Sequence, residues 1–174
     1  MKIMVFGNIC SGKSYLVNEV DGMFPGFEIV SVDDFRRRYG DGSMESEKRA
    51  KEVFLNAIVD GENQIVEAMG TGDTGEAIRE RVQNFSENVF VIILTTALPV
   101  CLERLSKRGC DVPYPAPKEN ARGLAMRMSH FFESDELSSR WKTLPNCWVV
   151  EANTTTSATT KLKAKLVEII DETN

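Results

Sequence analysis

A lysine and a serine close the segment at positions 7–14, which reads Gly-Asn-Ile-Cys-Ser-Gly-Lys-Ser. The segment matches the phosphate-loop pattern G-x-x-x-x-G-K-[ST] at every fixed position. The backbone N–H groups of such a loop and the N-terminus of the next helix face one concavity that suits a polyphosphate. We expect Lys13 to reach the β- and γ-phosphates and the Ser14 hydroxyl to bind Mg²⁺. The predicted nucleotide-binding residues here are Gly7, Asn8, Cys10, Ser11, Gly12, Lys13, Ser14 and Tyr15.

Acidic residues follow the next apolar segment, where Val30-Ser31-Val32 leads into Asp33, Asp34, Phe35 and Arg36. In an open parallel sheet, ligands bind beyond the carboxyl ends of the strands. A carboxylate at that edge can accept a proton from an acceptor hydroxyl, and we assign this role to Asp33. Arg36 is predicted to hold a phosphate or carboxylate of the acceptor. The alternative is that one of the two aspartates only caps a helix, with Asp34 favoured as the cap.

Glu67 ends a third apolar segment, Ile65-Val66. A carboxylate at that position would act on Mg²⁺ through water or on the substrate, and we group Glu67 with the substrate-binding residues. The alternative is a charge at the end of a strand that faces solvent.

Two arginines, Arg104 and Arg108, lie four residues apart and therefore share one face of a predicted helix. One could stack on a nucleotide base, and the other could meet phosphate charge in a transition state. The spacing leaves open which arginine takes which role; Arg104 is grouped with the nucleotide-binding residues. The alternative is that both only complement the dipole at the C-terminus of the helix.

The elements that must position these residues alternate between strand-like and helix-like segments, which is typical of a parallel sheet flanked by helices. We predict an α/β fold over residues 1–174 as one domain, with a five-stranded parallel sheet. The strands are expected at residues 3–6, 28–32, 64–67, 89–95 and 147–150. Helical spacing of apolar residues follows the phosphate loop, and further helices are expected around residues 50–58, 73–82, 98–109 and 157–170.

One segment breaks this alternation. Residues 109–117 contain three prolines, and a helical stretch with Leu124 and Met128 follows them. We predict that residues 109–143 form an insertion before the last strand, at the place where a mobile lid would lie. The polar side of its helix carries Arg122 and Arg127, which we assign to substrate binding.

Composition limits the class of protein. The chain has 174 residues, of which 42% are hydrophobic and 27% charged, and its net charge is −5. No apolar run approaches the ~20 residues of a membrane span. The four cysteines show no C-x-x-C spacing, so we expect reduced thiols, a cytoplasmic location and no membrane partner. The negative charge argues against a protein that holds long nucleic acid by its backbone.

These features together resemble the P-loop kinases of the nucleoside- and nucleotide-kinase type. The phosphate loop, Asp33, the Arg104 and Arg108 pair and the segment Glu151-Ala152-Asn153-Thr154 carry the resemblance. It implies ATP with Mg²⁺ as the phosphoryl donor, Asp33 as general base and Arg108 as a transition-state arginine. It also implies that Asn153 lies near the adenine.

A local resemblance points to the 5′-kinase domains of polynucleotide kinases. It rests on Asp33-Asp34-Phe35-Arg36, on Arg104 through Arg108-Gly109 and on Val112-Pro113. This resemblance implies that Arg36 binds an acceptor phosphate. Those domains have an Asp-Thr-Asn type of segment after the third strand, whereas this chain has Glu67-Ala68-Met69-Gly70.

The preferred hypothesis is therefore an ATP-dependent kinase that transfers the γ-phosphoryl group to a small acceptor. A nucleoside, a nucleotide or another small metabolite would fit. The alternatives are a polynucleotide 5′-hydroxyl kinase, an NTPase switch that acts on a protein partner, and a nucleotide-binding protein without catalysis. The chain has no Asn-Lys-x-Asp motif of the kind that GTPases use to read their base.

Overall fold

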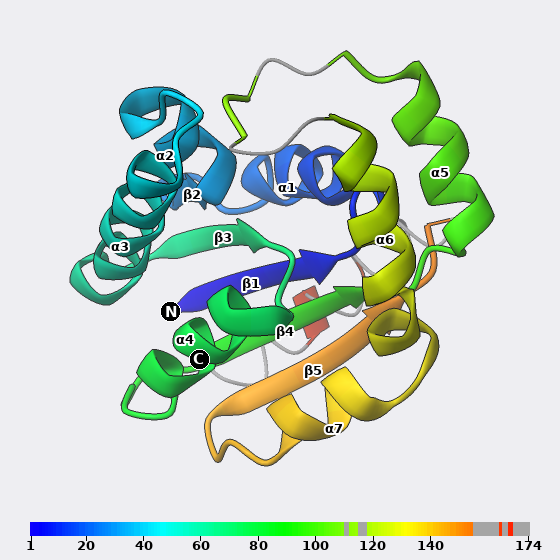
Figure 1. The fold of residues 1–174 in the computed structure, drawn as a ribbon. Coiled ribbons are helices and arrows are strands. Elements are labelled where there is room, and N and C mark those ends of the chain that lie inside the picture. Colours follow the sequence, from blue (N-terminus) through cyan, green and yellow to red (C-terminus); the bar gives the residue numbers. More distant parts are fainter. Residues whose placement is uncertain (110–111, 115–117, 155–163, 165–166, 169–174) are drawn as a thin grey trace.

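The computed structural model describes residues 1–109, 112–114, 118–154, 164 and 167–168. A parallel five-stranded sheet forms its centre, with strand order β2-β3-β1-β4-β5 (Figure 1). The strands are β1 (Lys2–Gly7), β2 (Glu28–Ser31), β3 (Gln64–Ala68), β4 (Val89–Leu94) and β5 (Cys147–Ala152). Each lies within two residues of its predicted bounds, and the predicted fold class is confirmed.

The central strands are buried on both faces, as their continuous apolar sequences require. Every residue of β1 and β4 is buried. In the register of the sheet, Ile3 of β1 pairs with Ile65 of β3 on one side and with Phe90 of β4 on the other. This register aligns the carboxyl ends of β1, β3 and β4, from which the candidate site residues follow.

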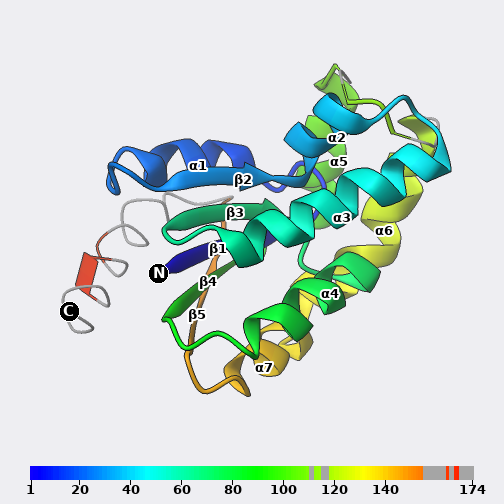
Figure 2. The same cartoon turned by 90° about the vertical axis from the view of Figure 1, so that its left-hand side faces the viewer.

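Helices cover the two faces of the sheet unequally, as the turned view shows (Figure 2). Helix α1 (Lys13–Asp21) packs Leu16, Val17 and Val20 against one face. Residues of α3, α4, α6 and α7 bury the other face. Helices α2 and α5 lie towards the end of the sheet at which the strand arrows point. The bounds are α2 (Val32–Tyr39), α3 (Met44–Asp60), α4 (Gly72–Val82), α5 (Leu98–Lys107), α6 (Lys118–Glu133) and α7 (Glu136–Lys142).

The predicted insertion at residues 109–143 needs correction in its extent. Phe132 at the end of α6 is buried, as are Leu137 and Trp141 of α7. The Trp141 ring lies 5.1 Å from the ring of Phe6 in β1, centroid to centroid. Because these side chains complete the core, the second half of the range belongs to the body of the domain. Helical spacing alone did not distinguish a core helix from one that lies above a site.

The predicted cap of α2 was also wrong. Ser31, not Asp34, is the N-cap residue, and its hydroxyl accepts a hydrogen bond from the Asp33 N–H. Asp34 instead pairs with Arg37 one turn later, at 2.7 Å. This cap fixes the start of α2, so that Asp33 lies in its first turn at the edge of the sheet.

The helix predicted at residues 157–170 lies almost entirely outside the described residues. Among the helices that the structure does describe, none is long and apolar enough to cross a membrane.

Candidate active site

A cavity of about 530 Å³ opens at the carboxyl edge of the sheet. We call it the phosphate-loop cavity. Its walls come from the loop after β1, the starts of α2 and α4, the C-terminal end of α5 and one side of α6. Charged, hydroxyl-bearing and apolar side chains line it, among them Lys13, Ser14, Asp33, Arg36, Lys51, Glu67, Met69, Arg104, Arg108, Tyr114, Leu124 and Met128.

The backbone of the phosphate loop takes left-handed conformations at two positions. Gly12, the residue before α1, has a φ of 102°, which favours glycine. Cys10 has a φ of 57°, although it carries a side chain. At Gly7, a Cβ atom would collide with the Ser11 side chain. The two glycines of the motif are therefore required by this loop's own geometry.

The loop is anchored at the Ser11 carbonyl oxygen. The Thr96 and Thr154 hydroxyls each donate to it at 2.8 Å, and Arg104 Nη1 donates at 3.2 Å. A second anchor is Asn8, whose side-chain amide donates to the Ala125 carbonyl of α6 at 2.8 Å. Strands β4 and β5 and helices α5 and α6 thus hold the loop in shape.

Lys13 folds back over its own loop. Its Nζ donates to the Gly7 carbonyl at 3.1 Å and to the Asn8 carbonyl at 2.9 Å. Burial lowers the pKa of Lys13 from its usual value, while the nearby carboxylates of Glu67 and Asp33 oppose that shift. A desolvated ammonium group in this position favours an anionic ligand.

Ser14 and Glu67 form one oxygen-rich pair. The Ser14 hydroxyl donates to Glu67 Oε1 at 2.8 Å. Burial raises the pKa of Glu67, although the charge of Lys13 and the Ser14 hydroxyl act in the opposite direction. Hydroxyl and carboxylate oxygens suit Mg²⁺, which takes one or two protein ligands together with phosphates and water. The donor set therefore fits the predicted metal, and Glu67 is not a charge directed only at solvent.

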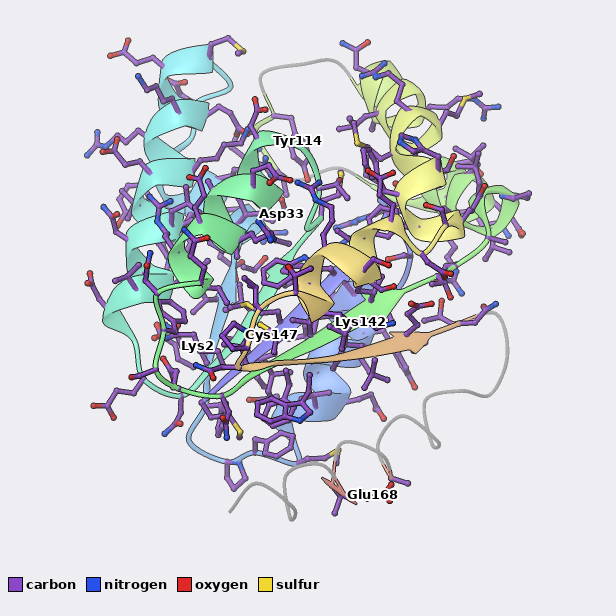
Figure 3. The ribbon with its side chains drawn as sticks, turned by 90° about the horizontal axis from the view of Figure 1, so that it is seen from below. Lys2, Asp33, Tyr114, Lys142, Cys147 and Glu168 are labelled. Carbon is purple, nitrogen blue, oxygen red and sulfur yellow. The ribbon has the colours of Figure 1, made fainter. Side chains whose placement is uncertain are left out.

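Asp33 faces the same cavity and has two partners. Arg36 Nη1 donates to Asp33 Oδ1 at 2.8 Å. The Tyr114 hydroxyl lies 3.0 Å and 3.1 Å from the two carboxylate oxygens. Figure 3 shows the labelled Asp33 and Tyr114 near one another. Burial and the Asp33 charge both raise the pKa of Tyr114, so its hydroxyl stays protonated and donates.

Each nitrogen of the Arg36 guanidinium donates to a carboxylate, and the predicted role of Arg36 as a ligand of the acceptor stays a prediction. Its Nε donates to Glu47 Oε2 at 2.8 Å and its Nη2 donates to Glu47 Oε1 at 2.7 Å. Burial alone would lower the pKa of Arg36, but the bonds to Glu47 and Asp33 raise it overall. Glu47 was not anticipated, because it lies in the first turn of α3, away from any strand end.

The two lid arginines approach the phosphate loop from α5. Arg104 Nη1 donates to the Cys10 and Ser11 carbonyls at 3.4 Å and 3.2 Å. Arg108, the residue after α5, lines the cavity. Burial lowers the pKa of Arg108, but contact with Cys10 and the charge of Asp33 raise it overall. The structure thus brings both arginines to the phosphate-loop side of the cavity.

Several other predicted residues lie elsewhere. Arg122 and Arg127 are exposed and do not line the cavity; the apolar Leu124 and Met128 of the same helix face it. Asn153 is exposed just after β5. Tyr15, by contrast, lines the cavity and is 63% exposed, whereas Gly7, Asn8 and Ser11 are buried and do not line it.

Thr96, Thr154 and Tyr114 were not predicted. The two threonines follow the ends of β4 and β5, so the rule that placed Asp33 and Glu67 at the carboxyl edge would also have found them. Tyr114 belongs to the proline-rich stretch, whose sequence has no periodicity that could place it.

No protein-family model matches the chain, and a search of curated protein sequences finds no match. Solved structures do match over nearly the whole chain. A gluconokinase from Sinorhizobium meliloti 1021 has 15% identity and a TM-score of 0.61, covering 99% of this chain and 97% of its own. A shikimate kinase from Acinetobacter baumannii in complex with shikimate has 16% identity and a TM-score of 0.61, with coverages of 99% and 94%.

A deoxyadenosine kinase from M. mycoides with bound dATP has 16% identity and a TM-score of 0.57, with coverages of 97% and 99%. All three are P-loop proteins of the nucleotide-kinase-like fold. At these identities the likeness establishes the architecture, and it agrees with the strand order and the phosphate loop described above. This chain therefore has the nucleotide-kinase-like P-loop fold.

Proposed function

We propose that this protein is an ATP-dependent phosphotransferase that phosphorylates a hydroxyl group of a small acceptor. One observation carries the proposal. The phosphate loop with Lys13 and Ser14 shares a single cavity with Asp33, a carboxylate in the first turn of α2, two residues after the end of β2. A nucleotide-binding protein without catalysis needs the loop but has no use for a carboxylate facing it.

The donor side of the cavity would hold the triphosphate. Lys13 would exchange its two carbonyl partners for phosphate oxygens, which are better partners for an ammonium group. Arg108 lies close enough to Asp33 and Glu67 to interact with their charges. It would add positive charge near the transferred group. Phosphoryl transfer depends mainly on such positioning and charge neutralisation.

Ser14 and Glu67 are the residues that would hold Mg²⁺, for which the hydroxyl and carboxylate oxygens fit. When bound, the ion neutralises charge on the phosphates. Glu67 would also keep the Ser14 side chain oriented through the hydrogen bond that it accepts from the Ser14 hydroxyl.

Asp33 would act on the acceptor side. The acceptor oxygen attacks the γ-phosphorus, the bond from the γ-phosphorus to the bridging oxygen breaks, and ADP leaves. The acceptor proton passes to Asp33, which Arg36 holds in place. The Tyr114 hydroxyl now occupies the position that the acceptor hydroxyl would take on this carboxylate.

The acceptor is small because the cavity is small. A volume of about 530 Å³ lies within the ~300–1,000 Å³ of ordinary small-molecule sites, and part of it must hold the triphosphate. The net charge of −5 gives little general attraction to a polyanion.

An ATP-consumption screen tests this proposal. The panel would contain nucleosides, nucleotides, sugars, hydroxy acids and short oligonucleotides, with ADP formation as the readout. We expect a small hydroxyl compound to raise ADP formation at least about tenfold over the acceptor-free rate, as a positioned acceptor group should. Lys13→Ala should abolish that increase.

Lys107→Ala is the matched control, because Lys107 is exposed and pairs only with Glu103 in the described contacts. A long oligonucleotide as the best acceptor would support the polynucleotide 5′-kinase alternative. Slow hydrolysis that no acceptor accelerates would contradict the kinase assignment and favour an NTPase switch.

A further inference from the structure

The acceptor side of the phosphate-loop cavity is electrically balanced by a buried carboxylate. Glu47 is 7% exposed, and its two carboxylate oxygens accept hydrogen bonds from the Arg36 guanidinium at 2.8 Å and 2.7 Å. Asp33 takes the remaining Arg36 nitrogen at 2.8 Å. All three guanidinium nitrogens therefore have a carboxylate partner. The Tyr114 ring covers the guanidinium, with Arg36 Cζ 4.9 Å from the ring centroid.

The next cation along the wall is balanced in the same way. Lys51 Nζ lies 3.0 Å from Glu47 Oε1, one turn along α3. Arg36 and Lys51 thus supply two positive charges, and Asp33 and Glu47 supply two negative charges. This patch has no net charge to offer an anion.

The remaining cations of the cavity belong to the donor. Lys13 and Arg104 bond to carbonyls of the phosphate loop, and Arg108 contacts Cys10 within it. The anionic triphosphate requires these charges. Arg122 and Arg127 of α6 are exposed and do not line the cavity.

Apolar side chains also line the cavity. Met69 after β3 and Leu124 and Met128 of α6 all line the cavity. An ionised group placed against such side chains loses its hydration without gaining a partner. A flat or apolar neutral body would instead gain from burial there.

We infer that the acceptor carries a neutral body around its reacting hydroxyl, without a phosphate or carboxylate beside it, and that Glu47 sets this preference by neutralising Arg36. The inference rests on the proposed function. It narrows the acceptor to an uncharged compound such as a nucleoside or a polyol. Glu47 acts through Arg36 and is therefore a specificity-determining residue, not a catalytic one.

An anionic acceptor bound at Arg36 would have to displace Glu47 or share the guanidinium with it. In either case the Glu47 carboxylate is almost fully buried, and it would remain near both Asp33 and the new anion. Like charges at such close range are costly and suppress the wrong partner. Specificity would thus come from repulsion as well as from fit.

The wild-type test uses matched acceptor pairs that keep the same free hydroxyl. One pair is a nucleoside and its 3′-monophosphate, and a second is a hexitol and the corresponding hexonate. We expect the neutral member to have a kcat/KM at least about tenfold higher. Equal or higher kcat/KM for the anionic member would overturn the inference, while leaving the kinase activity established.

Glu47→Gln tests the residue itself. The amide keeps the size of the side chain but removes its negative charge. The group of Arg36, Lys51 and Asp33 then has a net positive charge that can attract an anionic acceptor. The ratio of neutral to anionic kcat/KM should fall at least about tenfold. Glu103→Gln, in an exposed ion pair with Lys107, is the matched control and should leave the ratio unchanged.

The ratio separates specificity from a structural defect, because a loosened fold would lower both rates together. An unchanged ratio in a folded Glu47→Gln variant would overturn the role of Glu47. If that variant does not fold, the wild-type pairs still decide the acceptor class. If no acceptor raises ADP formation although ATP binds, the proposed function and this inference fail together.

Discussion

The Tyr114 hydroxyl lies 3.0 Å and 3.1 Å from the two carboxylate oxygens of Asp33. The two residues are 81 positions apart; Asp33 belongs to α2, whereas Tyr114 lies between α5 and α6, outside any helix or strand. A hydroxyl donor on a carboxylate at the mouth of the phosphate-loop cavity has the arrangement that an acceptor hydroxyl needs. In the proposed function, Tyr114 would therefore compete with the acceptor for Asp33.

Tyr114→Phe should relieve this competition. Because hydrogen bonds to charged groups contribute about 1.5–3 kcal/mol, the acceptor KM should fall several-fold or more, and acceptor-free ATP hydrolysis should rise. Steady-state kinetics with and without acceptor measure both quantities. A raised acceptor KM would instead indicate that Tyr114 contacts the acceptor directly.

Asp33 and Asp34 offer a matched pair of substitutions. Asp33→Asn removes the proton acceptor and should lower kcat about 10²–10⁴-fold, with the Kd for ATP nearly unchanged. Asp34→Asn breaks only an exposed ion pair with Arg37, and it should cost little. The reverse order of the two effects would contradict the assignment of roles.

Glu67 should make stability depend on pH. Burial raises its pKa in the folded protein, so its contribution is fully present below the pKa of the unfolded chain and is lost as the pH rises through the folded value. Glu67→Gln should therefore raise Tm in the absence of ligand, more at about pH 7 than at about pH 4. The same change should weaken the apparent Mg²⁺ affinity in turnover by about 10–100-fold.

Thermal unfolding across that pH range, without nucleotide or metal, provides the measurement for Glu67. Glu103→Gln serves as the control, since Glu103 is exposed. A Tm gain that does not vary with pH would show that the buried charge is not its cause.

Thr96 tests the anchor of the phosphate loop. It is 3% exposed, and its hydroxyl bonds to the Ser11 carbonyl. Thr96→Val keeps the shape and should lower the free energy of unfolding by about 0.5–1.5 kcal/mol, with weaker ATP binding. Thr95→Val, at the less buried neighbouring position, is the control. Equal effects of the two changes on urea unfolding would argue against a specific anchor.

The strands could be predicted closely because short, continuous apolar runs between turns are typical of strands buried on both faces of a parallel sheet. Lys13 and Ser14 of the motif line the cavity, and their binding of phosphate and Mg²⁺ stays a prediction. Glu67 stayed ambiguous, since its partner Ser14 lies 53 residues away and only the register of β1 and β3 brings them together.

Two of the corrections share one physical origin. A helix above a cavity directs its apolar side inward, so α6 presents Leu124 and Met128 where Arg122 and Arg127 were expected. In the same way, Trp141 belongs to the core because of what α7 packs against. Neither outcome follows from spacing along the chain, because both depend on the neighbouring element.

The central claim is that a phosphoryl group moves across one cavity, from a nucleotide on the phosphate loop to a hydroxyl at Asp33. Single-turnover transfer of label from [γ-³²P]ATP, with the best acceptor from the screen, tests it most directly. The account predicts that label appears in the acceptor with the wild-type protein, and is lost with Lys13→Ala and strongly slowed with Asp33→Asn. Label that appears only as inorganic phosphate, at a rate independent of acceptor and of Asp33, would contradict it.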